Sequence, residues 1–292
     1  MAAELVRELI DAGIHFGHRA SRWNPKMRPY IFGKRSTIHI VDIRETVRGL
    51  LRAKQFLAKV AAQGDDVLFV GTKRQARQLI KQHAERVGMP YVAERWLGGT
   101  LTNFRTIRSR LSRLEELEAA EADGTAQEYS KKMISTRTRE LRKIRRNLQG
   151  IRTMSRLPGG LVVIDVHREK SAIREAKKLG IPTVCLIDTD SDPEFADIPI
   201  PGNDDAIRSI DVVLTHLAEA IELGRKARSM PADDAMDTAA RPAGLNAERG
   251  AAERRSPGDG RAGNSSTLAG RASGDSEADL TPAAASRPDL TG

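Results

Sequence analysis

Short apolar runs alternate with longer helical patterns between residues 36 and 228, and this alternation restricts the possible folds more than any other feature of the chain. The runs are apolar at nearly every position, which is typical of strands buried on both faces of a parallel sheet. They cover residues 38–42, 67–71, 161–165 and 183–188. Each run is followed by a helical pattern, and these patterns cover residues 44–62, 73–87, 168–179 and 204–226.

Repeated strand-helix units predict the class of the fold. Right-handed crossovers between parallel strands place the helices on both faces of the sheet. We expect a further short strand at residues 90–93. The sequence therefore predicts a Rossmann-like parallel α/β domain made of residues 36–104 and 153–228. An N-terminal helix and a basic aromatic loop are expected before it, in residues 1–35.

The segment between the two halves of this domain has no strand signal. Residues 105–152 instead carry two long helical patterns, with residues 123–125 as a turn between them. Apolar residues seven apart favour packing of the second arm against a partner helix, and these are Ile134, Leu141 and Leu148. We predict an inserted antiparallel helical hairpin that resembles a short coiled coil. A helical pair packed flat on the sheet domain is the alternative.

The two arms of this hairpin carry opposite charges. Residues 131–152 contain nine Lys or Arg and one acid, whereas residues 115–123 contain five acids. Some of these charges should pair across the hairpin, where an exposed pair contributes only about 0 to 1 kcal/mol. The basic excess, together with Arg105 and Arg108 near the base, leaves two interpretations open: a solvated helical face, or direct contact with RNA.

The net charge of +9 is unevenly distributed along the chain. Residues 229–292 carry −3, so residues 1–228 carry +12. A body this basic indicates a polyanionic partner, and nucleic acid is the leading candidate. Residues 229–292 contain no Val, Ile, Phe, Tyr or Trp, so ordering them would bury too little apolar surface to offset the lost entropy. We predict a disordered C-terminal tail.

The sequence also argues against several classes of protein. No apolar run approaches the length of about 18 residues that a transmembrane helix needs, and the N-terminus lacks the pattern of a secretory signal. We therefore expect a cytoplasmic protein with no membrane partner. The single cysteine, Cys185, excludes an internal disulfide, and its apolar surroundings predict a buried, inert thiol.

The sharpest binding signal lies in residues 19–35, which contain six bases, three aromatic residues and no acid. Arg and Lys bind phosphates, and aromatic rings stack on bases. Pro25 and Pro29 disfavour a helix, so we expect an extended loop. Alternatively the rings anchor the loop to the sheet domain, which we expect for Phe32 and leave open for Tyr30. The expected RNA contacts here are Arg19, Arg22, Trp23, Asn24, Lys26, Arg28, Lys34 and Arg35.

Signals of catalysis or metal binding are weaker. Residues 70–74 place a glycine turn and a lysine between a strand and a helix, but the full phosphate-binding motifs G-x-x-x-x-G-K-[ST] and G-x-G-x-x-G are absent. Asp165 and Asp188 follow strands, where Asp commonly caps a turn. His15 and His18 have no third ligand at a suitable spacing. We expect no catalytic residue, metal, cofactor or small-molecule substrate. The rival hypotheses are a phosphate-binding enzyme and an adaptor that binds protein alone.

One region of the chain, residues 188–205, is acidic and is interrupted by three prolines. Its carboxylates could hold magnesium. However, Asn203 followed by Asp204 and Asp205 also matches a helix N-cap with acids in the first turn, which favour the positive end of the helix dipole. We predict the cap.

Six motifs occur in a fixed order along the chain: residues 15–18 (HFGH), 22–27 (RWNPKM), 29–32 (PYIF), 69–76 (FVGTKRQA), 95–104 (RWLGGTLTNF) and 199–210 (PIPGNDDAIRSI). Together they resemble the bacterial small-subunit ribosomal protein S2 family, and the likeness runs from about residue 4 to residue 228. Several long motifs in one order are far more specific than a single glycine turn.

The resemblance implies a non-enzymatic structural constituent of the small ribosomal subunit, with a parallel sheet and a projecting helical hairpin. It implies binding to small-subunit ribosomal RNA between head and body, and contact with neighbouring ribosomal proteins, including the large messenger-binding one. It adds Lys73, Arg74 and Arg95 to the expected RNA contacts, beside Arg105 and Arg108. The chain departs from the family in its longer tail, its arginine-rich second arm, and Asp190-Ser191 in place of Asn-Cys.

Overall fold

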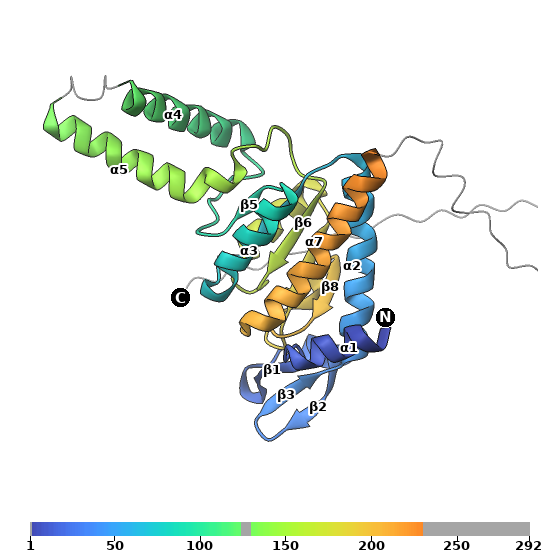
Figure 1. The fold of residues 1–292 in the computed structure, drawn as a ribbon. Helices are drawn as coiled ribbons and strands as arrows, with labels where there is room; N and C mark the ends of the chain where they lie inside the picture. The colour runs from blue at the N-terminus through green and yellow to red at the C-terminus, as the bar shows by residue number, and fades with distance from the viewer. Residues whose placement is uncertain (1, 124–129, 230–292) are drawn as a thin grey trace, which may run out of the picture. The chain divides into compact units, whose positions relative to one another are not determined.

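The computed structural model describes residues 2–123 and 130–229 of the chain. They belong to one compact unit. Two expectations fall largely outside the described residues: the turn at 123–125, and the disordered tail at 229–292. Figure 1 shows a central sheet with helices packed around it.

Five parallel strands form the central sheet, in the order β5-β4-β6-β7-β8. They are β4 (Val67–Val70), β5 (Tyr91–Val92), β6 (Gly160–Ile164), β7 (Thr183–Ile187) and β8 (Ile198–Pro201). The first four confirm the strands expected at these positions, and β4, β6 and β7 are buried throughout. β8 is absent from our expected strands because prolines interrupt it. Proline fits an edge strand, and β8 lies at the edge of the sheet.

Four helices packed around the sheet confirm the four helical patterns. They are α2 (Ile43–Gln63), α3 (Arg74–Val87), α6 (Lys170–Leu179) and α7 (Ile207–Ser229). The first three each end at a glycine with φ between 65° and 85°, a backbone conformation that strains other residues. α7 begins later than expected, after Asn203 has accepted the N–H groups of Asp205 and Ala206. No helix within residues 2–123 and 130–229 is both long and apolar enough to cross a membrane.

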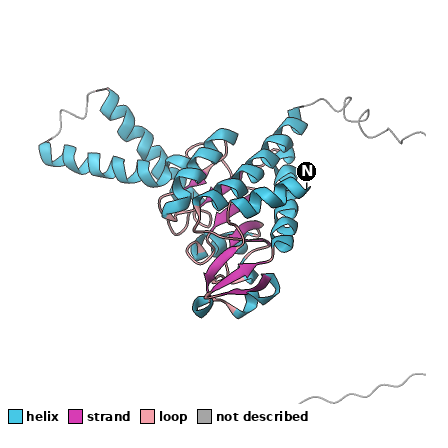
Figure 2. Cartoon of the chain, turned by 60° about the horizontal axis from the view of Figure 1, so that its bottom comes forward, coloured by secondary structure: helices cyan, strands magenta, loops and turns pink. Residues whose placement is uncertain are grey.

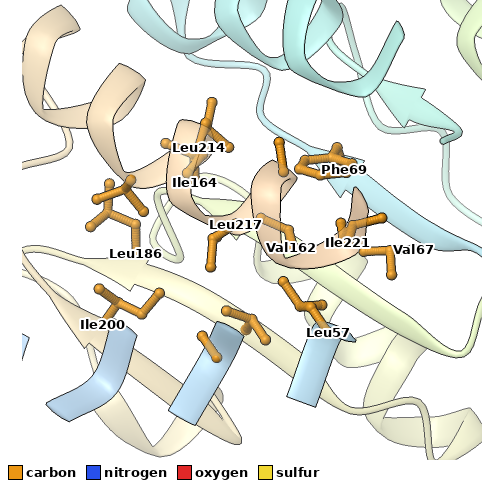
Figure 3. Close-up of a cluster of buried hydrophobic side chains, with 14 of the residues drawn as sticks. Leu57, Val67, Phe69, Val162, Ile164, Leu186, Ile200, Leu214, Leu217 and Ile221 are labelled. Atoms are coloured by element: carbon orange, nitrogen blue, oxygen red, sulfur yellow. The ribbon is translucent and has the colours of Figure 1, made fainter. Parts of the chain in front are cut away.

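Each face of the sheet buries its own apolar cluster. On one face α2, α3 and α7 cover the strands, and Leu57 and Leu217 of α2 and α7 approach Phe69 and Val162 (Figure 3). On the other face, α6 and the base of the inserted hairpin pack against the sheet. Helices therefore cover both faces, as predicted. Cys185 is fully buried in the second cluster, where burial raises its pKa to about 12.

The inserted segment forms the predicted helical hairpin, whose arms α4 (Phe104–Ala122) and α5 (Lys131–Leu148) lie side by side (Figures 1 and 2). At the base of the hairpin, apolar residues of both arms join the cluster of the sheet domain. Farther along, the arms form a small cluster of their own, made of Leu114, Leu117 and Leu141. This separate cluster favours a coiled-coil-like hairpin over a pair packed flat on the sheet.

The N-terminal part differs from prediction. Helix α1 (Ala2–Asp11) precedes a separate antiparallel sheet with the order β1-β3-β2. Its strands are β1 (Phe16–Arg19), β2 (Ile31–Arg35) and β3 (Ile38–Val41). The parallel strand expected at 38–42 is therefore wrong. Only Val41 of β3 is buried, and the short turn at Ser36, with φ 56°, joins β2 and β3 as an antiparallel hairpin.

The expectation of an extended loop in residues 19–35 is wrong at two places. Residues Ala20–Arg22 (η1) and Pro25–Tyr30 (η2) form short 3-10 helices. Pro25 is tolerated because it lies in the first turn of η2, where the N–H that it lacks has no partner. Pro29 lies inside η2. Asn24 caps η2 by accepting the N–H of Lys26 at 3.0 Å.

Candidate nucleic-acid interface

Many of the expected contact residues gather at the edge of the sheet where the parallel strands end. Arg74 follows β4 and Arg95 follows β5. The N-terminal segment meets the same edge after β7, where Thr189 accepts the N–H of His18 on its hydroxyl at 2.9 Å and the N–H of Asn24 on its carbonyl at 2.8 Å. The loops at this edge are the usual ligand-binding region of open α/β sheets.

Five exposed cations of the N-terminal segment form a set that we call the basic rim: Arg19, Arg22, Arg28, Lys34 and Arg35. The register of the antiparallel sheet brings two of them close, because Arg19 of β1 and Arg35 of β2 both pair with Ile38 of β3. Two strand spacings, about 10 Å, separate their backbones. Within residues 2–123 and 130–229, no side chain of the basic rim forms an ion pair.

Two other expected contacts of this segment make internal interactions instead. The Trp23 ring is half-buried, with its centroid 5.0 Å from that of His39. The Lys26 ammonium lies 2.5 Å from Glu194 and 3.0 Å from Asp192, and hydrogen bonds to these carboxylates raise its pKa. Trp23 and Lys26 therefore hold the segment in place.

Phe32 is 79% exposed, so the expectation that it anchors the segment is wrong. Side chains alternate along a strand, and its neighbour on β2, Ile31, takes the inward position. Tyr30 does pack against the core and is half-buried. Phe32 instead lines an apolar hollow of about 840 Å³ beside α1 and α2, with Ile10 and Leu51 in its wall.

Lys73 is not one of the free cations. Its ammonium lies 2.6 Å from Asp204, 2.7 Å from Asp205 and 3.6 Å from Asp165, acids that follow β8 and β6. The Lys73 side chain is only 12% exposed. Burial by itself lowers the pKa of Lys73, but the three carboxylates outweigh it and raise the pKa. Lys73 therefore neutralises acids that the parallel strands bring together.

His18 completes this group. We call the group the acidic centre: His18, Lys73, Asp165, Asp188, Asp204 and Asp205. His18 Nδ1 lies 2.9 Å from Asp188 Oδ2, and Nε2 lies 3.2 Å from Asp205 Oδ2. The hydrogen bond to Asp188 raises the pKa of His18 to about 9. Burial and the neighbouring acids raise the pKa of Asp204.

Three of these residues could hold a divalent cation. His18, Asp188 and Asp204 each offer one ligand atom, and the three atoms lie within 4.8 Å of one another. Spacing along the chain gives no sign of this set, because the strands join residues from distant segments. The predicted helix N-cap is wrong, because α7 begins only at Ile207. Asn203 instead caps a turn before the helix, and Asp204 and Asp205 face Lys73.

The glycine turn after β4, which resembles part of a phosphate loop, is occupied by a carboxylate of the chain itself. Glu169 accepts the N–H of Thr72 at 2.9 Å and its hydroxyl at 2.5 Å. Glu169 is 2% exposed, and this burial raises its pKa. A phosphate would need such N–H donors near the start of α3, and the donor at Thr72 is already used. The geometry gives no support to a phosphate-binding enzyme.

The remaining expected RNA contacts lie farther along the same edge of the sheet, beside β4 and β5. Arg74, Arg95 and Arg105 are exposed and, in the described part of the chain, form no ion pair. Arg108 donates to the carbonyl of Met154 at 3.1 Å. Three strand spacings, about 14 Å, separate β5 from β7. The fold thus brings two groups of free cations to one edge without merging them.

Glu175 is a site residue that our sequence expectations lack. Its carboxylate accepts the indole N–H of Trp96 at 3.0 Å and the backbone N–H groups of Gly99, Leu101 and Thr102 at 2.9 to 3.1 Å. Burial by itself raises the pKa of Glu175, but these donors lower it overall. Glu175 fixes the glycine turn between β5 and α4, and a single acid on α6 gives no signal of this role.

Comparison with known proteins agrees with the motifs. Residues 9–224 match the family model of ribosomal protein S2. The chain is 62% identical over 225 residues to the small ribosomal subunit protein uS2 of Rhodopirellula baltica, covering 77% of this chain and 86% of that protein. It is 50% identical over 228 residues to uS2c of Rhodomonas salina, with coverages of 78% and 94%. It is 49% identical over 226 residues to uS2 of Syntrophobacter fumaroxidans, with coverages of 77% and 82%. The chain therefore belongs to the ribosomal protein S2 family.

Proposed function

We propose that the basic rim, together with Arg74, Arg95 and Arg105, binds small-subunit ribosomal RNA. As a member of the ribosomal protein S2 family, the chain is a structural protein of the small ribosomal subunit and not an enzyme. Its place of action is the ribosome, and we infer the ribosome of the cytoplasm. The observation that carries the RNA proposal is a set of exposed cations with no acid partner in the described chain.

Free cations favour a polyanion because they can neutralise its phosphates and release the counterions around them. The small antiparallel sheet and the turn held by Glu175 set the spacing of these cations. Contacts of this kind go to the sugar-phosphate backbone, so the shape of the RNA determines the fit more than its base sequence does.

We no longer expect Lys73 to contact RNA, and we assign Lys26 and Trp23 a supporting role. Lys73 would have to give up three carboxylates to reach a phosphate, which would leave the nearly buried Asp204 uncompensated. Lys26 and Asn24 hold the N-terminal segment against the loop after β7, and Trp23 packs on His39 of β3. We infer that they position the basic rim and do not themselves carry most of the affinity.

Neighbouring ribosomal proteins are the second class of partner. The hollow around Phe32 fits them better than it fits RNA, because its wall is mainly apolar. An exposed apolar surface of this kind is typical of protein interfaces. The large messenger-binding ribosomal protein, which the resemblance implies, is our candidate for this hollow.

The salt dependence of binding tests the RNA proposal. The chain should be rebound to small subunits that lack it, and co-sedimentation measured across salt concentrations. If about eight phosphates are neutralised, the affinity should fall roughly 10³- to 10⁵-fold between about 50 and 200 mM salt. Binding that stays constant across this range contradicts the proposal.

A variant of the basic rim localises the effect. Its changes are Arg19→Gln, Arg22→Gln and Arg35→Gln. Each lost phosphate contact should lower the slope of log affinity against log salt by about 0.7 to 0.9, so the slope should fall by about 2 to 3. The matched control removes three exposed cations elsewhere, through Arg52→Gln, Lys59→Gln and Arg174→Gln. Equal slopes for the two variants, or loss of the thermal unfolding transition in the rim variant, would count against this assignment.

A further inference from the structure

The cations of the second hairpin arm include two sets that differ in whether the chain supplies their partners. The first set faces α4: Glu118 lies 2.9 Å from both Arg145 of α5 and Arg152, which follows the end of α5. These two hydrogen-bonded partners lower the pKa of Glu118. Arg152 also lies 3.7 Å from Glu115. Glu115 and Glu118 of the first arm thus pair with cations of the second arm.

The second set lies on the side of α5 opposite its buried residues. We call it the α5 stripe, and it consists of Lys132, Arg139, Lys143 and Arg146. A helix turns about 100° per residue, so these four positions fall within an arc of about 60°. The buried residues Leu141 and Leu148 lie on the opposite side of the same helix. With a rise of about 1.5 Å per residue, the α5 stripe is about 21 Å long.

The α5 stripe has no acid of its own. All four side chains are exposed, and none forms an ion pair within the part of the chain that the structure describes. The single acid of this arm, Glu140, acts on Arg113 of α4, where it helps to raise the pKa of that arginine. Four uncompensated cations on one face of a helix repel one another in the free protein, and binding to a polyanion would relieve this repulsion.

We propose that the α5 stripe is a second surface for the sugar-phosphate backbone of small-subunit ribosomal RNA. This inference rests on the proposed function and adds to it a site on the hairpin. The residues beside the stripe are small and polar, Ser135, Thr136 and Asn147, and they include no large apolar side chain. A protein interface needs an apolar centre, whereas a phosphate backbone needs only cations and hydrogen-bond donors. The composition of the stripe therefore favours RNA over an acidic protein.

The positive surface continues from the hairpin onto the sheet domain. Arg146 lines a hollow of about 360 Å³ between α5 and α3, and Arg77 and Lys81 of α3 line it too. The acid in this hollow, Glu94, lies 3.3 Å from Arg77. Arg146 therefore leads the stripe toward the edge of the sheet that carries Arg95, and one RNA backbone could follow both. Lys81 is paired within its own helix, since its ammonium lies 4.0 Å from Glu85.

A charge-neutral variant of the full chain tests the proposal. Its changes are Lys132→Gln, Arg139→Gln, Lys143→Gln and Arg146→Gln, which keep good helix formers on α5. The matched control carries Arg52→Gln, Lys59→Gln, Arg174→Gln and Lys178→Gln, four exposed cations on α2 and α6. With small subunits that lack this protein, the stripe variant should lower the salt slope of binding by about 3, and the control should leave it unchanged. Equal effects of the two variants overturn the proposal.

Two further measurements keep a negative result interpretable. Charge-retaining changes, Lys132→Arg and Lys143→Arg, should preserve the salt slope, and helix content by circular dichroism should match in all variants. If the basic rim variant lowers the slope and the stripe variant does not, the inference about α5 fails while the proposed function stands. If the unmodified chain shows no salt dependence, the proposed function itself fails.

Cross-linking identifies the partner directly. Because Cys185 is fully buried, a cysteine introduced by Arg139→Cys is the reactive thiol for a photo-activated cross-linker. In reconstituted subunits we expect a product that nuclease digests to a short RNA remnant. A product that nuclease leaves intact and protease degrades to a second polypeptide would show that the stripe binds protein, and would overturn the proposal.

Discussion

The acidic centre and the basic rim both contain cations near the same edge of the sheet, but their counter-charges differ. Lys73 is 12% exposed and lies against acids that follow β6 and β8. Arg22 of the basic rim is exposed and unpaired within residues 2–123 and 130–229. A cation whose partner comes from the same chain stabilises the fold, and one without such a partner is available to RNA. Whether a cation is paired within the fold or free therefore depends on which distant segment of the chain lies beside it.

The change with the largest expected effect removes the cation of the acidic centre. Lys73→Ala leaves the nearly buried Asp204 without its counter-charge, and breaking a buried pair costs about 3 to 5 kcal/mol. Because Asp204 can take up a proton when its pKa is raised, we expect the lower end of this range. Urea unfolding at pH 7.5 measures the loss.

The matched control for Lys73 is a cation of the basic rim. Arg22→Ala should leave the free energy of unfolding nearly unchanged, because this side chain has no partner to lose within the described residues. It should weaken binding to small subunits instead. If both variants lose the same stability, or if Lys73→Ala weakens RNA binding while the fold stays stable, the distinction between the two clusters is wrong.

Local patterns predicted the fold well where burial is uniform. β4, β6 and β7 are apolar at nearly every position, so their pattern and length clearly indicated buried strands. The run at β3 looks equally apolar, but only Val41 is buried, and the short turn before it pairs β3 with β2. A sequence does not show which sheet an apolar run joins when a hairpin competes with a crossover.

The site was harder to predict, since its chemistry depends on contacts between distant residues. Cation-rich segments such as residues 19–35 were visible from composition, and most of those cations are exposed. Lys73 sits in an equally convincing motif, yet Asp204 neutralises it from 131 positions away. Glu175 gave no signal because its partners are mainly backbone N–H groups. Composition shows where cations are abundant, but only the tertiary fold shows which of them have no acid partner.

The pH dependence of stability should distinguish the acidic centre from the rest of the molecule. The pKa of His18 is raised to about 9 from its ordinary value of 6.5. Its protonated form is therefore favoured by folding, and this stabilisation is complete below pH 6.5 and is lost as the pH rises through about 9. We expect His18→Gln to cost on the order of 2 kcal/mol at pH 6 and little at pH 10.

Urea unfolding of both proteins from pH 6 to pH 10, with a chelator present, measures this difference. His167→Gln is the matched control, because His167 is exposed and forms no ion pair in the described part of the chain. The cost of the control gives the baseline for the loss of an exposed imidazole. A pH-independent cost for His18→Gln would mean that the carboxylates around His18 do not stabilise its charge.

The smallest expected effect is that of Lys26, which is paired like Lys73 of the acidic centre but exposed like the cations of the basic rim. Its ion pairs with Asp192 and Glu194 are internal, but its side chain is 46% exposed. Lys26→Ala should leave thermal unfolding unchanged, because exposed ion pairs contribute little to stability. RNA binding should weaken by about twofold at most, since the change uncovers two acids beside the basic rim.

A combined variant separates that indirect effect from a direct contact. If Lys26 acts only by masking the acids, then Lys26→Ala together with Asp192→Ala and Glu194→Ala should restore the affinity of the unmodified chain, because no uncovered charge remains. If Lys26 touches a phosphate, the combined variant should stay as weak as Lys26→Ala alone. The difference in affinity between the single and the combined variant thus measures the coupling of Lys26 to Asp192 and Glu194. Restoration means that Lys26 acts only by masking the two acids, and persistent weakness means that it contacts a phosphate or positions the basic rim.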